Sequence, residues 1–180
     1  MDESIEIREL ARDELTLVRE IDRTERIEVL YEQHGTELRE RHGDFDASPW
    51  DPDGDGGHSV QAQHRVLLHD ATRGGIAHGA FTEGRLIGIG VVVPHLRPGI
   101  AQLAYLHVSN GHRDAGVGDR LMAGLEEVAR RAGDSEIVVS ATPSAHTVAF
   151  YTRRGFRPMA TPLPELFELE PDDIHLHKAL

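Results

Sequence analysis

The chain has 180 residues, a formal net charge of −12 and no cysteine. The lack of cysteine excludes disulfides, thiolate metal sites and a cysteine nucleophile. The negative charge argues against nucleic acid as a partner, because phosphates would be repelled, and it mildly favours a cationic partner; solubility alone also explains such a charge.

Hydrophobic residues at 39% and charged residues at 28% are ordinary globular values, so we expect one domain over residues 1–180. The acidic start, residues 1–4, has neither a basic flank nor an apolar core, and therefore no signal peptide is evident. No run approaches the roughly 18 apolar residues that a membrane span needs. We expect a cytoplasmic protein with no membrane partner.

The first elements are a strand at residues 5–8 and a helix from residue 12, in which Leu15, Val18 and Ile21 mark one face. Residues 26–41 fit two structures. The spacing of some apolar residues suits a helix, whereas alternation around His34 and Gly35 favours a hairpin with its turn there. We favour the hairpin.

Residues 45–57 form a predicted loop, punctuated by proline and glycine. Within it, residues 51–56 imitate the first half of a calcium-binding loop. The twelfth position of that pattern needs a bidentate glutamate, and Ala62 occupies it. A solvated acidic turn therefore explains the segment better than a calcium-responsive module. Trp50 either anchors this loop to the core or lines an acceptor pocket, and we favour the anchor.

A helix is predicted over residues 58–72, with Val60, Leu67 and Leu68 buried. Two strands follow, residues 76–81 and 85–93, joined by a tight turn. Residues 94–99 read as an exposed loop, and residues 103–108 as the next strand.

A glycine turn, residues 112–118, lies between that strand and an amphipathic helix that ends at Gly133. Gly116 and Gly118 allow the backbone to bend and a ligand to approach closely. Unpaired N–H groups and the helix dipole would meet there, which suits a phosphate or diphosphate, and Arg113 adds a permanent positive charge. The turn lacks the Walker and dinucleotide patterns, so by itself it also fits a simple tight turn.

Downstream lie a strand at residues 137–140 and a segment that contains Tyr151, Gly155 and Phe156. In this order and spacing, the chain resembles the GCN5-related N-acetyltransferases (GNAT superfamily). Residues 113–118 match the signature Arg/Gln-x-x-Gly-x-Gly/Ala. The later signature, Asn-x-x-Ala-x-x-x-Tyr-x-x-x-Gly-Phe, is matched at the tyrosine and Gly-Phe, with Ser144 in place of asparagine and Thr147 in place of alanine.

The resemblance implies an α/β fold with a mixed, mainly antiparallel central sheet that splays in the middle and is flanked by helices. The implied co-substrate is acetyl-CoA, bound by the core at residues 76–160, between acceptor-side elements at 1–75 and C-terminal strands at 161–180. The implied contacts are the strand edge at Leu106, His107 and Val108, the turn Arg113, Asp114, Ala115, Gly116, Val117 and Gly118, and Ser144.

Direct transfer to an amine requires loss of a proton from an ammonium with a pKa of about 10. The backbone N–H of Val108 would stabilise the carbonyl oxygen, and Tyr151 is the candidate acid for the leaving thiolate, unless it is only a packing aromatic. The base is unassigned: Gln102 stands near the position where the family often has a glutamate, and Tyr105, His107, Glu25 or a water chain stay open.

Two departures bear on the diphosphate: Asp114 and Asp119 should weaken its binding unless their side chains point to solvent. The chain ends with predicted strands at residues 167–169 and 174–178, the second with His175 and His177 on a polar face. No third ligand accompanies these histidines, so no metal is expected.

The sequence therefore predicts an N-acetyltransferase acting on an amine of a small molecule or peptide, with a homodimer left open. The alternative is a non-catalytic acyl-CoA-binding regulatory protein.

Overall fold

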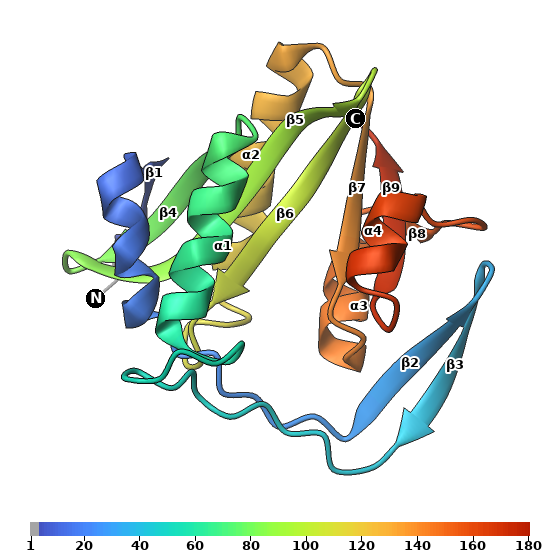
Figure 1. Cartoon of the computed structure of the whole chain (residues 1–180), viewed down its shortest axis with the longest axis horizontal. Helices are drawn as coiled ribbons and strands as arrows, with labels where there is room; N and C mark the ends of the chain where they lie inside the picture. The colour runs from blue at the N-terminus through green and yellow to red at the C-terminus, as the bar shows by residue number, and fades with distance from the viewer. Residues whose placement is uncertain (1–3) are drawn as a thin grey trace.

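The computed structural model describes residues 4–180 and arranges them around a seven-stranded sheet (Figure 1). From edge to edge the strands are β1 (Glu6–Glu9), β4 (Ile76–Thr82), β5 (Arg85–Arg97), β6 (Ile100–Val108), β7 (Glu136–Ala141), β9 (Ile174–Ala179) and β8 (Arg157–Pro158). Among these neighbours, β6 and β7 alone are parallel, which confirms the predicted mixed, mainly antiparallel sheet. Residues 1–3 lie outside the described residues, so the expectation for the start of the chain stays a prediction.

Helices cover both faces of the sheet (Figure 1). On one face, the 3-10 helix η1 (Arg12–Glu20) and α1 (Val60–Thr72) share an apolar cluster with β5 that includes Trp50, the predicted anchor. On the other lies α2 (Val117–Ala132). It approaches β5 closely because Gly90 has no Cβ. A Cβ at that position would stand 2.6 Å from a methyl carbon of Leu125. Close packing here fixes the N-terminus of α2 beside the end of β6.

The sheet opens between its two parallel strands. Their register runs from the pair Ile100 and Glu136 to the pair Leu103 and Val139 and stops there. Beyond Leu103, β6 continues to Val108 paired with β5 only. The predicted splay is therefore present, and one backbone edge of β6 faces the gap.

Residues 26–41 form the predicted hairpin, not a helix: β2 (Val29–His34) pairs with β3 (Glu37–His42). Gly35 has a φ of 62°, which glycine adopts without a Cβ penalty. Gln33 ties the hairpin to the body, since its Nε2 donates to the carbonyl of Met159 at 3.0 Å and its Oε1 accepts from the N–H of His175 at 2.7 Å.

The prediction of an exposed loop at residues 94–99 is wrong, because β5 continues through this segment to Arg97. Pro94 lies in an irregular part of the pairing with β6. The next residue, His95, has a φ of 55°, and the Asp134 carboxylate accepts hydrogen bonds from its N–H and ring Nδ1, both at 3.0 Å. The Asp134 side chain thus stabilises the irregular part of β5 that follows Pro94, where proline provides no N–H for the pairing with β6.

The C-terminal prediction needs two corrections. Residues 167–169 belong to helix α4 (Pro164–Leu169), because proline starts a helix well and Leu163 and Leu166, three residues apart, are both buried against Val138. The strand at 174–178 is confirmed as β9, but His175 is 2% exposed and not on a polar face.

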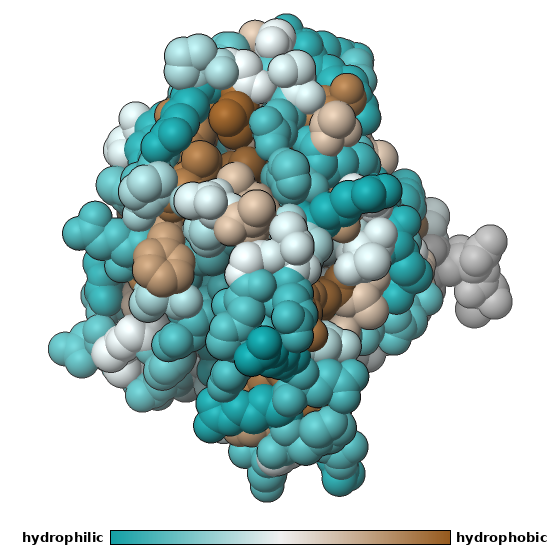
Figure 2. All heavy atoms as spheres, turned by 90° about the vertical axis from the view of Figure 1, so that its right-hand side faces the viewer, coloured by the Kyte–Doolittle hydropathy of each residue, from teal (hydrophilic) through white to brown (hydrophobic). Residues whose placement is uncertain are grey.

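The face that carries α4 and the β2–β3 hairpin is mostly hydrophilic, with hydrophobic atoms in separate patches (Figure 2).

The remaining helix, α3 (Ala145–Arg153), follows β7 and packs into the main core through Val148 and Tyr151. No helix within residues 4–180 is long and apolar enough to cross a membrane.

Candidate active site

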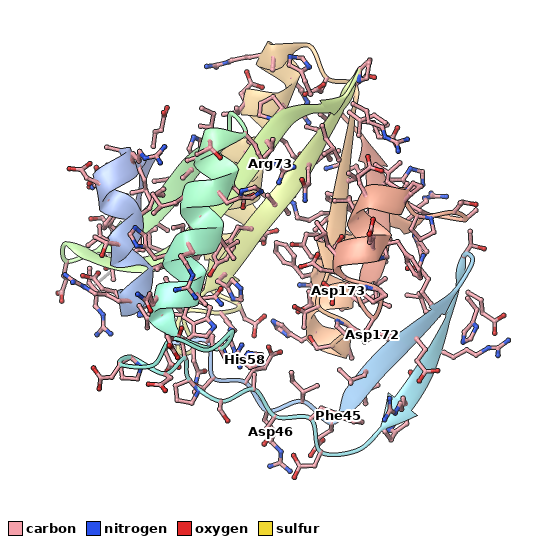
Figure 3. All side chains as sticks on the ribbon, viewed as in Figure 1. Phe45, Asp46, His58, Arg73, Asp172 and Asp173 are labelled. Atoms are coloured by element: carbon pink, nitrogen blue, oxygen red, sulfur yellow. The ribbon has the colours of Figure 1, made fainter. Side chains whose placement is uncertain are left out.

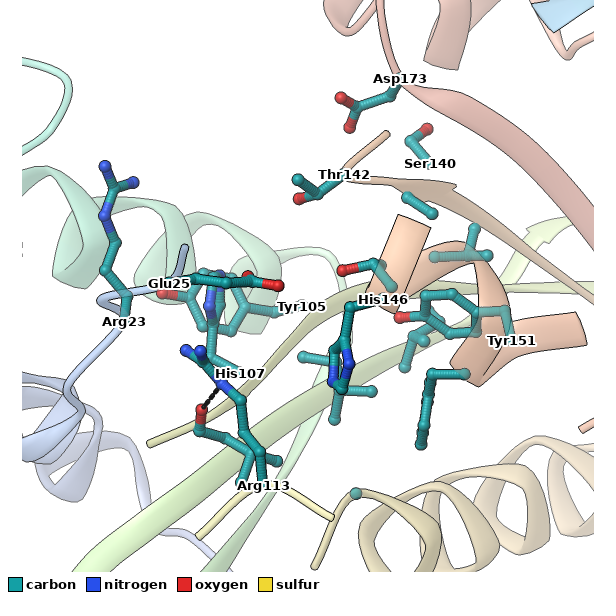
Figure 4. A pocket seen from close by; sticks show the side chains of 18 of the residues that line it. Arg23, Glu25, Tyr105, His107, Arg113, Ser140, Thr142, His146, Tyr151 and Asp173 are labelled. Carbon is teal, nitrogen blue, oxygen red and sulfur yellow. Dashed lines mark hydrogen bonds between the residues drawn. The ribbon is translucent and has the colours of Figure 1, made fainter. Parts of the chain in front are cut away.

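A cavity of about 530 Å³ occupies the gap where β6 and β7 separate (Figure 4). Its walls come from segments far apart in the sequence: the loop after η1, the end of β6, the glycine turn, the end of β7, α3, and the loop between α4 and β9. The polar lining residues drawn there are Arg23, Glu25, Tyr105, His107, Arg113, Ser140, Thr142, His146, Tyr151 and Asp173.

The β6 wall contains all three strand residues that the sequence placed at the cofactor, Leu106, His107 and Val108. On their other side these residues pair with β5. Apart from the Val108 carbonyl, which accepts a hydrogen bond from Arg113, the backbone groups on the open edge could pair with an extended ligand, as in strand addition to a sheet edge.

The glycine turn leads directly into α2 and leaves backbone N–H groups exposed at the start of that helix. Gly116 is the N-cap of α2 with a φ of 77°, and the first N–H inside the helix that finds a helical carbonyl belongs to Arg120. The N–H groups of Val117, Gly118 and Asp119 thus lie at the positive end of the helix without helical partners.

The predicted turn residues divide into two sets. Asp114, Gly116 and Gly118 line the cavity. The Val117 side chain is 1% exposed and packs beneath the turn, and Ala115 is exposed. Any side chain on Gly118 would press on the ring of Phe150, which lies 3.1 Å from an ideal Cβ.

Arg113 fixes the turn to two other segments. Its Nε donates to the carbonyl of Val108 at 3.1 Å, and its Nη1 donates to the carbonyl of Thr24 at 2.8 Å. The guanidinium thus lines the cavity in an orientation set by backbone carbonyls and adds positive charge beside the turn.

Both acids near the turn line the cavity and are exposed to solvent. Asp119 pairs with Arg154 at 2.9 Å, with its side chain 60% exposed, so a cation offsets its charge. Asp114 lines the mouth of the cavity and is exposed to solvent.

Ser144 lies apart from the residues that line the main cavity and caps α3. Its Oγ accepts from the N–H of Thr147 at 3.2 Å and donates to the Thr147 hydroxyl at 2.9 Å. The substitutions at the positions of asparagine and alanine in the family signature therefore form one contact.

Tyr151 lies on the wall opposite β6, and its hydroxyl faces the cavity (Figure 4). The residue is 4% exposed, and Phe150 and Phe156 hold its ring edge-to-face, each with ring centres 5.2 Å apart. Within residues 4–180 the hydroxyl has no hydrogen-bond partner. Burial, with a contribution from Asp173, raises the pKa of Tyr151, so the hydroxyl stays protonated at neutral pH.

Two candidate bases from the sequence are poorly suited to accept a proton. The Tyr105 hydroxyl donates to Gln63 at 2.8 Å, and burial raises its pKa. His107 packs against the rings of Trp50 and Tyr105, and burial, with Arg23 and Arg113 nearby, lowers its pKa to about 4. Gln102 is bonded to Arg73 at 2.6 Å and does not line the cavity. Glu25 does line it.

Glu170 and Asp173 line the cavity, and sequence reasoning missed both. Burial, then the charges of Glu170 and Asp172, raises the pKa of Asp173 to about 7. Burial likewise raises the pKa of Glu170. An acidic turn before a last strand gives no local signal of function, because such turns are common at solvent-exposed positions.

The segment that imitates a calcium loop has a local structural role. The Asp51 carboxylate accepts from the N–H groups of Asp53 and Gly54, both at 3.0 Å, which stabilises the turn before α1. Within residues 4–180, no group of three potential ligands is placed to hold a metal.

Structures with this fold are known. A nourseothricin acetyltransferase is similar at a TM-score of 0.71 and 18% identity, covering 97% of this chain and 98% of that one. The PaiA N-acetyltransferase of Thermoplasma acidophilum, in complex with coenzyme A, gives 0.64 and 18%, covering 98% and 99%. A Bacillus anthracis str. Ames structure that contains acetyl coenzyme A gives 0.64 and 18%, covering 100% and 98%. Comparison with curated protein sequences gives no match.

A mixed sheet that splays beside a glycine turn defines an α/β protein with a cleft between its two parallel strands. The acetyltransferase (GNAT) family matches residues 20–156. The chain belongs to this family and is an acetyltransferase, which confirms the fold and reaction class inferred from the sequence motifs.

Proposed function

We propose that the chain transfers an acetyl group from acetyl-CoA directly to a primary amine of a small molecule or peptide. One observation carries the proposal: the open edge of β6, the N-terminus of α2 and the Tyr151 hydroxyl meet in one cavity. Similar structures hold acetyl coenzyme A or coenzyme A, which supports the choice of co-substrate.

The cofactor would lie with its diphosphate at the glycine turn, held by the N–H groups at the start of α2 and by the charge of Arg113. Its extended arm would pair with the backbone of β6 at Leu106, His107 and Val108. Ser144 would act indirectly, because its hydroxyl is occupied in capping the helix that carries Tyr151.

The thioester would then lie between Val108 and Tyr151. The N–H of Val108 would stabilise the oxyanion formed on attack. Tyr151 would donate its proton to the departing sulfur. Burial that raises the pKa of the tyrosine also raises the pKa of a thiol placed beside it, so donor and acceptor stay matched.

The test is release of free thiol from acetyl-CoA with a panel of amines: n-butylamine, benzylamine, putrescine and lysine amide. We expect amine-dependent release, and about a 100-fold lower kcat with unchanged acetyl-CoA affinity for Tyr151→Phe. The alternative, an acyl-CoA-binding regulator, predicts that acetyl-CoA binds by calorimetry but that no amine-dependent thiol is released. The background rate of thiol release would then be the same in Tyr151→Phe as in the parent protein.

A further inference from the structure

The loop between α4 and β9 places one carboxylate at the cavity. Asp173 precedes the first residue of β9 and lines the gap on the side of β7, whereas Asp172 is exposed and does not line it (Figure 3). In the close view, the Asp173 carboxylate faces the space that Tyr151 and Glu25 also face (Figure 4).

Asp173 is partly buried without a counterion. Within residues 4–180, its carboxylate forms neither an ion pair nor a side-chain hydrogen bond, and the charges that act on it are those of Glu170 and Asp172. Glu126 is the contrast: its side chain, 4% exposed, is bound by Lys178 at 2.8 Å and by Arg154 at 3.5 Å. A partly buried carboxylate that has no counterion and is destabilised by neighbouring acids favours a cationic ligand.

A second group in the same cavity lacks a partner. Tyr151 is 4% exposed, and its unpaired hydroxyl faces the cavity. It lies near enough to Asp173 for that carboxylate to raise its pKa. One ligand with a thioester sulfur at the hydroxyl and an ammonium at the carboxylate would satisfy both groups.

We propose that Asp173 binds the ammonium group of the acceptor and accepts its proton before acetyl transfer. The inference rests on the proposed function and assigns the base that the sequence left open. It also assigns a class of acceptor: an aliphatic amine that arrives as a cation, in preference to an arylamine that is neutral at pH 7.

The proton and bond changes balance without another reagent. The acceptor ammonium gives one proton to Asp173 and becomes a neutral amine. Its nitrogen bonds to the thioester carbon, the carbon–sulfur bond then breaks, and the thiolate takes the Tyr151 proton. The second proton leaves the nitrogen for the tyrosinate. Asp173 finally releases its proton to solvent, and the products are an amide and free coenzyme A.

The charge environment makes Asp173 a suitable base near neutral pH. Burial, Glu170 and Asp172 raise its pKa to about 7, which is close to optimal for proton transfer at physiological pH. The other titratable or charged groups that line the cavity are Tyr105 and His107 from β6, His146 and Tyr151 from α3, Glu170 from its own loop, and Arg23, Glu25, Arg113, Asp114, Asp119 and Arg153.

The decisive measurement is kcat/KM against pH, from about pH 5 to about pH 9, with the best amine of the panel and saturating acetyl-CoA. In the parent protein we expect kcat/KM to rise with pH, with its midpoint near pH 7, and to level off above that pH. Asp173→Asn should lower kcat/KM about 100-fold or more and remove the rising limb of the pH profile, with acetyl-CoA affinity unchanged. Asp172→Asn is the matched control: it should keep the rate and the rising limb, with the midpoint moved to lower pH, because the charge of Asp172 contributes to the raised pKa of Asp173.

Two further variants keep the proposal open to refutation. Glu25→Gln and His146→Gln each remove another possible base from the cavity wall, and each should retain the rising limb near pH 7. The proposal is overturned if either removes it, or if Asp173→Asn keeps it. Aniline should react far more slowly than n-butylamine, and equal rates would also count against it. Amine-dependent thiol release by the parent protein tests the proposed function separately; its absence would overturn both.

Discussion

Two buried or partly buried carboxylates in this fold have opposite surroundings. Glu126, on α2, is 3% exposed and bound by three cationic side chains: Lys178 at 2.8 Å, Arg130 at 3.4 Å and Arg154 at 3.5 Å. Asp173 lies at the cavity, and the charges that shift its pKa are both negative. The ion cluster around Glu126 joins α2 to the end of α3 and to β9, whereas the Asp173 carboxylate links no elements through an ion pair within residues 4–180.

The difference separates a charge that stabilises the fold from a charge that awaits a ligand. Removing one member of a buried ion cluster leaves uncompensated charges and weakens folding. Removing an unpaired carboxylate relieves the cost of its desolvation and of its repulsion by neighbours. The two positions should therefore respond to the same chemical change with opposite effects on stability.

The largest expected effect is on Glu126→Gln. It leaves Lys178, Arg130 and Arg154 without their shared carboxylate, and we expect a loss of about 3 kcal/mol in the free energy of unfolding, measured by urea denaturation. Glu127→Gln is the matched control, because Glu127 is 47% exposed and pairs with Arg131 on the surface. That change should cost less than about 1 kcal/mol. Equal losses for the two variants would show that the buried cluster has no special role.

Asp173→Asn should instead stabilise the protein, and only at higher pH. The folded-state pKa of Asp173 is raised to about 7, so the folded protein holds this proton more tightly than the unfolded chain does. Its ionisation therefore destabilises the fold increasingly between about pH 4 and about pH 8. We expect a gain on the order of 1–2 kcal/mol at pH 8, allowing for partial exposure, and no gain at pH 4.

The measurement is urea denaturation of Asp173→Asn and Asp172→Asn at both pH values. A stability gain that is the same at pH 4 and pH 8 would mean that the charge of Asp173 is not its cause.

Sequence reasoning predicted those parts of the molecule that local patterns determine. The hairpin turn at Gly35, the glycine turn at residues 112–118 and the position of Tyr151 on α3 each depend on spacing or on a motif that lies within a few residues, whereas the splay of the sheet was implied only by the family resemblance. Apolar alternation was misleading at residues 167–169, where proline before Leu166 starts a helix instead.

The acceptor side could not be predicted, because it is assembled from distant segments. Asp173 comes close to Tyr151 because β9 inserts between β7 and the edge strand β8, which brings the start of β9 to the end of β7 that precedes α3. Ser144 was placed at the cofactor by its position in a family signature, while its contact with Thr147 depends on both substitutions in that signature. Neither local propensity nor spacing reports such pairings.

Glycine substitutions extend the comparison from charges to the backbone. Gly111 and Gly116 have φ values of 87° and 77°, and an added Cβ would meet no atom within 4 Å at either. Alanine at each should cost about 1 kcal/mol in stability from backbone strain alone. Gly116 lines the cavity and Gly111 does not. Gly116→Ala should therefore weaken acetyl-CoA binding several-fold by calorimetry, and Gly111→Ala should not. Equal affinities would remove the glycine turn from the cofactor site.

The smallest effect is expected for Ser144→Ala, and it separates stabilising a helix from binding a ligand. Loss of the N-cap hydroxyl should cost roughly 1 kcal/mol, because the N–H of Thr147 loses its acceptor. Ser144→Asn restores a capping side chain and the residue usual in the family, and it should recover most of that stability. If Ser144 acts only through the helix, the KM for acetyl-CoA stays within about twofold for both variants once the folded fraction is equal. A KM that rises in the alanine variant and falls in the asparagine variant would instead place this side chain at the cofactor, as its position in the family signature implied.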